Sequence, residues 1–125
     1  MSHLTLHNLT IKKFNEGFRN KEFSAFEIAK EFFDYIEETD QKVGAFLSLA
    51  KDEALAQAEQ ADIALAKGED LGDLAGVPLA IKDNILIKGQ PATAASKILE
   101  NYKASYDSTV ARKLKASGAV FLGKT

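Results

Sequence analysis

The amino-acid sequence predicts an α/β fold, in which amino-terminal helices are followed by part of a mixed, largely parallel sheet with covering helices. In the first half of the chain, apolar residues recur at helical spacing. In the second half, two short apolar runs, at residues 77–81 and 119–122, flank a segment with helix-capping signals. This order of strand, helix and strand is typical of parallel sheets, and we expect a right-handed crossover between the two strands.

Three helices and one short strand are expected in the first half. The approximate helix ranges are 9–20, 24–38 and 52–67, and the strand covers 45–50. Ser24 and Glu27 have the spacing of a capping box, in which the hydroxyl accepts from a backbone amide and the carboxylate reaches back. The second helix carries an apolar stripe, which we expect to pack on the rest of the domain. The third alternates acidic and small residues, which indicates a solvated outer face.

The second half is expected to contain a strand that ends near Lys82, an irregular segment over 88–95, a helix and a final strand. Asp107 is the expected amino-terminal cap of the helix, and Gly118 is expected to end it. The final strand, 119–122, is apolar throughout, as expected of a strand covered on both faces. No covering element follows it in the sequence, so we expect an open edge that favours self-association.

The stretch GVPLAIKDNI, residues 76–85, holds the best candidate for chemistry, Lys82. Strand alternation places Lys82 on the same face as Ala80 and on the opposite face from Ile81. A side chain placed in this way projects at the carboxyl end of the strand, where open α/β sheets bind ligands. The simpler alternative is a solvated lysine that lies beside Asp83 at the surface.

A general base must hold an unprotonated amine. The ordinary pKa of a lysine is about 10.4, so a lysine base near neutrality needs a pKa about 3 lower, which costs about 4 kcal/mol. Burial of Lys82 away from carboxylates would supply this change. The neighbouring Asp83 would oppose it unless its side chain points elsewhere, as neighbouring strand residues normally do.

Several segments of the chain resemble one family. They are the amino-terminal helices and the stretches LAGVPLAIKDNILIKG, TAASKILENY and YDSTVARKLKASGAVFLGKT. In this order and at compatible spacing they are similar to the start of amidase signature proteins, and within that family to the A subunits of aspartyl/glutamyl-tRNA amidotransferases. The resemblance runs over essentially all 125 residues. It implies that residues 1–125 are the amino-terminal part of a single amidase domain, truncated before the catalytic serines.

For Lys82, the resemblance implies the role of base in a Ser, cis-Ser, Lys triad. The two serines of that triad belong to a glycine- and serine-rich segment that does not occur in this sequence. The resemblance further implies that glutamine is the substrate and that its ammonia converts Glu-tRNA(Gln) or Asp-tRNA(Asn) to the amidated form. The implied partners are the B and C subunits. ATP, Mg2+ and tRNA belong mainly to the partner subunit, so no cofactor is expected in this chain.

Composition excludes several classes of site. The chain has no cysteine, which excludes disulfides, a thiolate nucleophile and zinc sites built on cysteine. The net charge is -2 with acidic and basic residues interspersed, which offers no patch for a phosphate backbone. No apolar run approaches membrane-spanning length, and the start MSHLTLHNLT has no basic leader. We therefore expect a cytoplasmic protein, or an organellar one in a eukaryote, without a membrane span.

Three other motifs match known patterns but lack the necessary context. Residues 118–125, GAVFLGKT, fit the phosphate-loop pattern, but a helix is expected before the motif and a strand within it. Ser48 and Lys51 have a spacing used by penicillin-recognising enzymes, which requires a helix, whereas Ser48 lies in an expected strand. His3 and His7 are spaced for one helix face but have no carboxylate or cysteine set to complete a metal site.

Two alternative functions stay open. A stand-alone amidase that acts on small or aliphatic amides would share the same segments, and it would lack the residues that bind the ammonium and carboxylate groups of glutamine. A non-catalytic interaction fragment is the other alternative, because both catalytic serines are absent from these residues.

Overall fold

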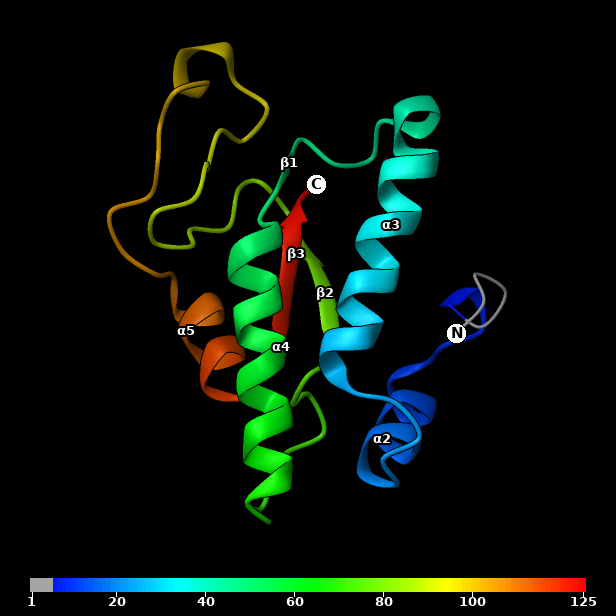
Figure 1. The fold of residues 1–125 in the computed structure, drawn as a ribbon. Coiled ribbons are helices and arrows are strands. Elements are labelled where there is room, and N and C mark those ends of the chain that lie inside the picture. Colours follow the sequence, from blue (N-terminus) through cyan, green and yellow to red (C-terminus); the bar gives the residue numbers. More distant parts are fainter. Residues whose placement is uncertain (1–5) are drawn as a thin grey trace.

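The computed structural model describes residues 6–125. Its helices are α2 (Ile11–Arg19), α3 (Ala25–Val43), α4 (Lys51–Ala66), the 3-10 helix η1 (Lys97–Leu99) and α5 (Thr109–Ala116). Its strands are β1 (Ser48–Leu49), β2 (Pro78–Ile81) and β3 (Val120–Lys124). Figure 1 shows the strands behind α3 and α4, with α2 near the amino terminus. The fold is therefore α/β with amino-terminal helices, as predicted.

The three strands form one mixed sheet in the order β1, β3, β2. β2 and β3 are parallel, whereas β1 and β3 are antiparallel. The predicted open edge at the final strand is wrong, because β1 pairs with one side of β3 and β2 pairs with the other. β3 is thus the central strand. The expected self-association was based on an unpaired edge at β3, and that edge is not present.

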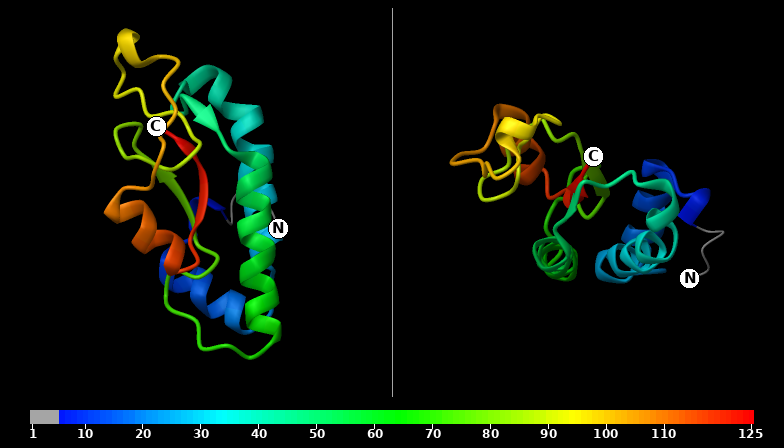
Figure 2. Two further views of the ribbon diagram at one scale, coloured as in Figure 1. Left: turned by 90° about the vertical axis from the view of Figure 1, so that its left-hand side faces the viewer. Right: turned by 90° about the horizontal axis from the view of Figure 1, so that it is seen from above.

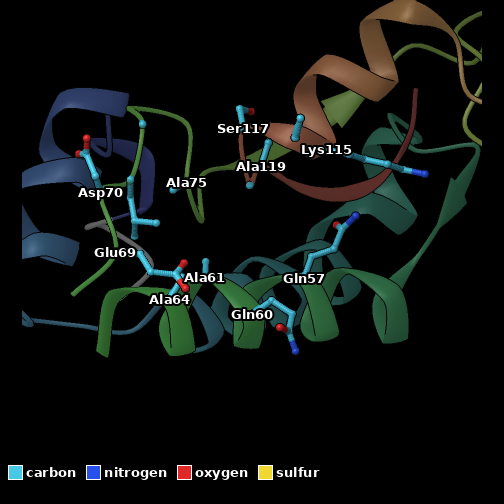
Figure 3. Close-up of a pocket in the computed structure, with 14 residues that line it drawn as sticks. Gln57, Gln60, Ala61, Ala64, Glu69, Asp70, Ala75, Lys115, Ser117 and Ala119 are labelled. Carbon is cyan, nitrogen blue, oxygen red and sulfur yellow. The ribbon is translucent and has the colours of Figure 1, made fainter. Parts of the chain in front are cut away.

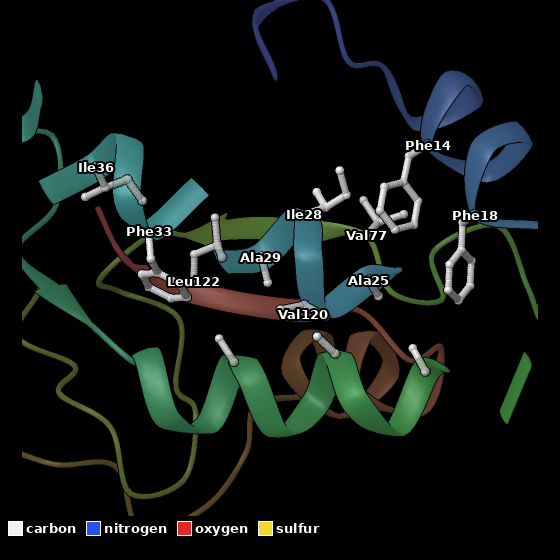
Figure 4. Packing of buried hydrophobic residues seen from close by; sticks show 13 residues of the cluster. Phe14, Phe18, Ala25, Ile28, Ala29, Phe33, Ile36, Val77, Val120 and Leu122 are labelled. Carbon is white, nitrogen blue, oxygen red and sulfur yellow. The ribbon is translucent and has the colours of Figure 1, made fainter. Parts of the chain in front are cut away.

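Side chains of β3 enter cores on both faces of the sheet. Val120 and Leu122 pack with buried residues of α2, α3 and α4 (Figure 4). Phe121 lies on the opposite face, where it packs with Ile87 and with Ala111 of α5. Figure 2 shows the same arrangement, with α3 and α4 on one side of the strands and α5 on the other. Coverage on both faces explains why β3 is apolar at successive positions.

Small residues bring α4 close to α3 and β3. Ala54, Ala58 and Ala61 share one face of the helix and are buried. The side-chain oxygen Oε1 of Gln57 accepts a hydrogen bond from the backbone amide of Phe121 in β3 at 2.8 Å. The predicted solvated face of α4 lies opposite the face formed by these three alanines.

The end of α3 and the strand after it differ from the predicted ranges. The helix continues to Val43 and ends at Gly44, whose φ of 66° lies in the left-handed region that glycine tolerates best. The next two amides, of Ala45 and Phe46, donate to the carboxylate of Asp40 at 2.7 and 3.1 Å. Because that carboxylate satisfies them, these two amides are not used for strand pairing, and β1 covers Ser48–Leu49 instead of the predicted 45–50.

The helix caps show one confirmed prediction and one error. Ser24 caps α3, and its hydroxyl accepts from the amide of Glu27 at 3.0 Å. The cap of α5 is Ser108, which accepts from the amide of Ala111 at 3.1 Å, so the predicted cap at Asp107 is wrong. Serine and aspartate are about equally good caps, so the sequence pattern does not decide between two neighbours.

Among the helices of residues 6–125, none combines the length and apolar character needed to cross a bilayer.

Candidate active site at the carboxyl ends of β2 and β3

Lys82 directly follows β2, as predicted. Ile81 is buried, whereas Ala80 and Lys82 are exposed, so the alternation expected from the sequence is observed. The side chain of Lys82 is therefore presented at the carboxyl end of a parallel strand. This is the part of an α/β sheet at which ligands usually bind.

Hydrogen bonds hold the backbone on both sides of Lys82. The amide of Thr125 donates to the carbonyl of Ile81 at 2.9 Å, and the amide of Asp83 donates to the carbonyl of Thr125 at 2.8 Å. The carbonyl of Lys82 accepts from the amide of Ile85 at 3.0 Å, which closes a turn. The exposed side chain therefore starts from a fixed backbone position.

Asp83 is buried, in contrast to its neighbour Lys82. Its side chain is held by the loop that follows β2, and the residue is only 3% exposed. The Oδ2 atom accepts from the amide of Thr93 at 3.2 Å and from the hydroxyl of the same residue. Asp83 therefore does not lie beside Lys82 at the surface. The other part of the simpler alternative, an exposed Lys82, agrees with these residues.

A second lysine lies at the end of β3. Lys124 stands opposite Ile81 in the register of the two parallel strands and is 0% exposed. Its Nζ donates to the carbonyl of Ile85 at 2.6 Å and lies 4.0 Å from Oδ1 of Asp83. Burial lowers the pKa of Lys124 below its ordinary value, and the charge of Asp83 opposes that change.

The buried pair of Asp83 and Lys124 was not predicted from the sequence. The predicted final strand, 119–122, ended before Lys124, whereas β3 includes it. A signal for this pair was present in the sequence. The two predicted strands are parallel neighbours, so the residues near their carboxyl ends, Asp83 and Lys124, are expected to lie close together. The Oδ1 atom of Asp83 is buried and, within residues 6–125, has no hydrogen-bond partner. The ammonium of Lys124 is the charge that compensates it.

A groove of about 700 Å³ lies on a different part of the surface. It runs between α4, which contributes Gln57 and Gln60, and the end of α5, which contributes Lys115 (Figure 3). The loop residues Glu69 and Asp70 close one end. Lys82 is not among the lining residues, so this groove does not belong to the candidate site.

Two of the alternative motifs lie in elements that do not suit their chemistry. Most of the phosphate-loop-like segment 118–125 is strand β3, preceded by α5, so its backbone cannot form the required loop before a helix. Ser48 lies in β1, and Lys51 begins α4, where its amine pairs with Glu37 at 3.1 Å. The Ser48 and Lys51 side chains therefore do not share a helix face.

The histidines offer no metal site in the part of the chain that the structure describes. His7 packs edge-on against Tyr35, with ring centroids 5.1 Å apart. His3 lies outside the described residues. Within residues 6–125, no group of three or more histidine, aspartate or glutamate side chains is placed to hold a metal ion.

Comparison with known proteins shows strong similarity along the chain. The family model described as Amidase matches residues 27–125. The A subunit of the glutamyl-tRNA(Gln) amidotransferase of Fusobacterium nucleatum is 47% identical over 125 residues, which are 100% of this chain and 26% of that protein. The protein of the same name from Gloeobacter violaceus is 52% identical over 106 residues, which are 85% of this chain and 22% of that protein.

Two solved structures with a similar backbone are amidases by name. A bacterial aryl acylamidase of the amidase signature family has a TM-score of 0.87 and 28% identity, over 94% of this chain and 25% of its own. The native peptide amidase from Stenotrophomonas maltophilia has a TM-score of 0.86 and 28% identity, over 92% of this chain and 24% of its own. The chain thus spans about a quarter of the length of the relatives that it matches.

Proposed function

Because the chain belongs to the amidase family, we propose that it forms the amino-terminal quarter of an amidase-type enzyme in which Lys82 is the catalytic base. The observation that carries the proposal is the placement of Lys82. It is an exposed lysine directly after a parallel strand, with a fixed backbone and with the neighbouring carboxylate buried elsewhere. The proposal includes the sequence prediction that residues 1–125 are part of a single amidase domain.

The more specific proposal is that the enzyme hydrolyses glutamine as the A subunit of a tRNA-dependent amidotransferase. Relatives with that name reach 47% identity over the whole chain, which supports this function over other amidases. In this proposal, the released ammonia passes to a complex with B and C subunits. The partner subunit uses ATP and Mg2+ to amidate Glu-tRNA(Gln) or Asp-tRNA(Asn).

The proposed reaction is acyl transfer. Nζ of Lys82 accepts a proton through a bridging serine, and the nucleophilic serine attacks the carboxamide carbon of glutamine. Ammonia leaves, and water then hydrolyses the acyl-enzyme. Both serines, and the backbone amides that stabilise the oxyanion, would come from residues after 125. The same residues would have to cover Lys82, because a lysine base needs a drier environment than the solvent that surrounds it here.

The test is the substitution Lys82→Ala in the intact protein that carries these residues. We expect kcat for ammonia release from glutamine to fall by about 10²- to 10⁴-fold, the usual contribution of a general base. The thermal unfolding midpoint should stay unchanged, because an exposed side chain is removed. Lys12→Ala, at another exposed lysine, is the matched control and should keep full activity. A folded Lys82→Ala protein with wild-type hydrolysis would exclude the proposed role.

A stand-alone amidase is the second candidate, and the similarity to an aryl acylamidase and a peptide amidase supports it. The two functions differ in substrate preference. An assay of ammonia release should show a higher kcat/KM for glutamine than for small aliphatic or aryl amides if the enzyme belongs to the amidotransferase. The opposite order would favour the stand-alone amidase.

Residues 1–125 alone are expected to release no ammonia from glutamine. They contain the proposed base, but a base cannot form an acyl-enzyme without its nucleophile and oxyanion site. The measurement is ammonia release by the purified 125-residue chain at high concentration. Activity above that of a Lys82→Ala sample would place the nucleophile within the chain, with Ser48 and Ser96 as the serines to replace first.

A further inference from the structure

Two ionisable side chains are buried together next to the candidate base. Asp83 is 3% exposed and Lys124 is 0% exposed. Burial of two charges is unfavourable unless they compensate each other, and apolar side chains of similar size usually fill such a space at least as well. The position of this pair beside Lys82 therefore calls for an explanation beyond stability.

Lys124 holds the turn that follows the candidate base. Its Nζ donates to the carbonyl of Ile85 at 2.6 Å. The amide of the same Ile85 donates to the carbonyl of Lys82 at 3.0 Å. One peptide turn therefore connects the buried ammonium to the backbone of Lys82.

Asp83 holds the loop that comes back to the strand end. Its carboxylate accepts from the amide and hydroxyl of Thr93, and its carbonyl accepts from the amide of Ala94 at 3.1 Å. Ala94 and Ala95 have φ of 49° and 58°, a left-handed conformation that non-glycine residues seldom adopt. The hydroxyl oxygen of Thr93 accepts from the amide of Ala95 at 3.3 Å. Strained turns of this kind persist where surrounding contacts define them fully, and they cluster at functional sites.

We propose that Asp83, Thr93 and Lys124 form a positioning cluster, which sets the direction of the Lys82 side chain for proton transfer. This inference rests on the proposed function of Lys82 as the base. Asp83 and Lys124 are buried and Thr93 is half-buried. The three residues act through the backbone of Lys82. Catalytic groups must be held within about 0.5 Å of the productive geometry, and a misplacement of about 1 Å can lower the rate by about 100-fold.

The experiment uses the intact protein and the variants Asp83→Asn and Thr93→Val, each alone and in a Lys82→Ala background. Thr93→Val is the milder change, because it removes one hydroxyl and keeps both buried charges. We expect each single variant to lower kcat for glutamine hydrolysis by about 10- to 100-fold with KM unchanged. In the Lys82→Ala background we expect no further loss in residual hydrolysis, because the cluster acts through Lys82.

Asp107→Asn is the matched control. Asp107 also accepts from a backbone amide, that of Lys88 at 2.8 Å, and from a lysine amine, that of Lys115 at 2.8 Å. These hydrogen bonds join the start of the α5 region to Lys88 and do not include the turn at Lys82. We expect kcat of this variant to remain that of the wild type, which separates positioning of Lys82 from a general effect of losing a paired carboxylate.

The possible results distinguish failure of the inference from failure of the proposed function. A folded Lys82→Ala protein with full activity removes the proposed function itself. An inactive Lys82→Ala protein together with wild-type kcat in folded Asp83→Asn and Thr93→Val overturns only the positioning cluster. The cluster is equally overturned if either substitution lowers the residual rate of Lys82→Ala by the same factor as in the wild type.

Discussion

Two lysines at adjacent strand ends occupy opposite environments in this molecule. Lys82 follows β2 and is exposed, whereas Lys124 ends β3 and is completely buried. Each lysine comes after a short apolar run, so the local sequence does not separate them. The difference comes from the sheet, in which β3 is central and β2 has only one partner strand among the described residues. Position in the sheet, more than local pattern, decides whether a strand-end lysine is available for chemistry.

The same comparison limits the use of a lowered pKa as a marker of catalysis. Strongly perturbed lysines are often functional, because desolvation frees the amine from its proton. Here burial lowers the pKa of Lys124. However, its Nζ donates a hydrogen bond to the carbonyl of Ile85, and the side chain is buried away from solvent. The candidate base is the other lysine, Lys82, which is exposed.

The largest expected effect contrasts the same substitution at both lysines. Lys124→Met leaves the carboxylate of Asp83 buried without a compensating charge, so the free energy of unfolding should fall by about 3–5 kcal/mol. Lys82→Met should change it by less than about 0.5 kcal/mol, as for most surface substitutions. Urea unfolding of the two variants is the measurement. Equal losses would mean that the environments of the two lysines differ less than the structure indicates.

A smaller effect on the free energy of unfolding is expected at Gly123, where β1 pairs with β3. A Cβ atom added at Gly123 would lie 2.3 Å from the carbonyl oxygen of Ser48. Gly123→Ala should therefore push β1 away and lower the free energy of unfolding by about 1–3 kcal/mol, the usual cost of overpacking. Gly72→Ala is the control, because its added Cβ would meet nothing within 4 Å. If Gly123→Ala leaves the free energy of unfolding unchanged, β1 does not pack closely against the end of β3.

The smallest effect concerns an ion pair near the surface, which contrasts with the buried one. Asp107 and Lys115 are 24% and 35% exposed. The hydrogen bond from Lys115, helped by the amide of Lys88, lowers the pKa of Asp107 below its ordinary value of 3.8. We expect Asp107→Asn to lower the free energy of unfolding at neutral pH by at most about 1 kcal/mol, because solvent screens such pairs.

The pH dependence of that variant follows from the direction of the pKa change. Near and below pH 3.8, the unfolded chain binds more protons at Asp107 than the folded chain does. The stabilisation is thus present above the ordinary pKa and is lost as the pH falls through the lowered one. Unfolding curves of the wild type and Asp107→Asn should therefore converge in acid. A constant gap between them would assign the effect to packing.

Local chemistry was enough to predict much of the fold. Amphipathic spacing located α2 and α3, and an alanine-rich segment that stops before Gly68 located α4. Gly118, in a left-handed conformation, marks the stop after α5. Period-two alternation correctly placed Lys82 on the face of Ala80 and opposite the buried Ile81. These features depend on residues within a few positions of one another, so their causes are contained in the sequence.

Tertiary structure alone decided the features that depend on distant segments. The apolar pattern of β3 required two covered faces, but only pairing with β1, much earlier in the chain, made it the central strand. Lys124 is buried because that pairing and the loop after β2 close over the strand end, where Asp83 supplies the opposite charge. The free energy of a residue depends on what surrounds it, and for Lys124 the surroundings come from parts of the chain that no local pattern connects.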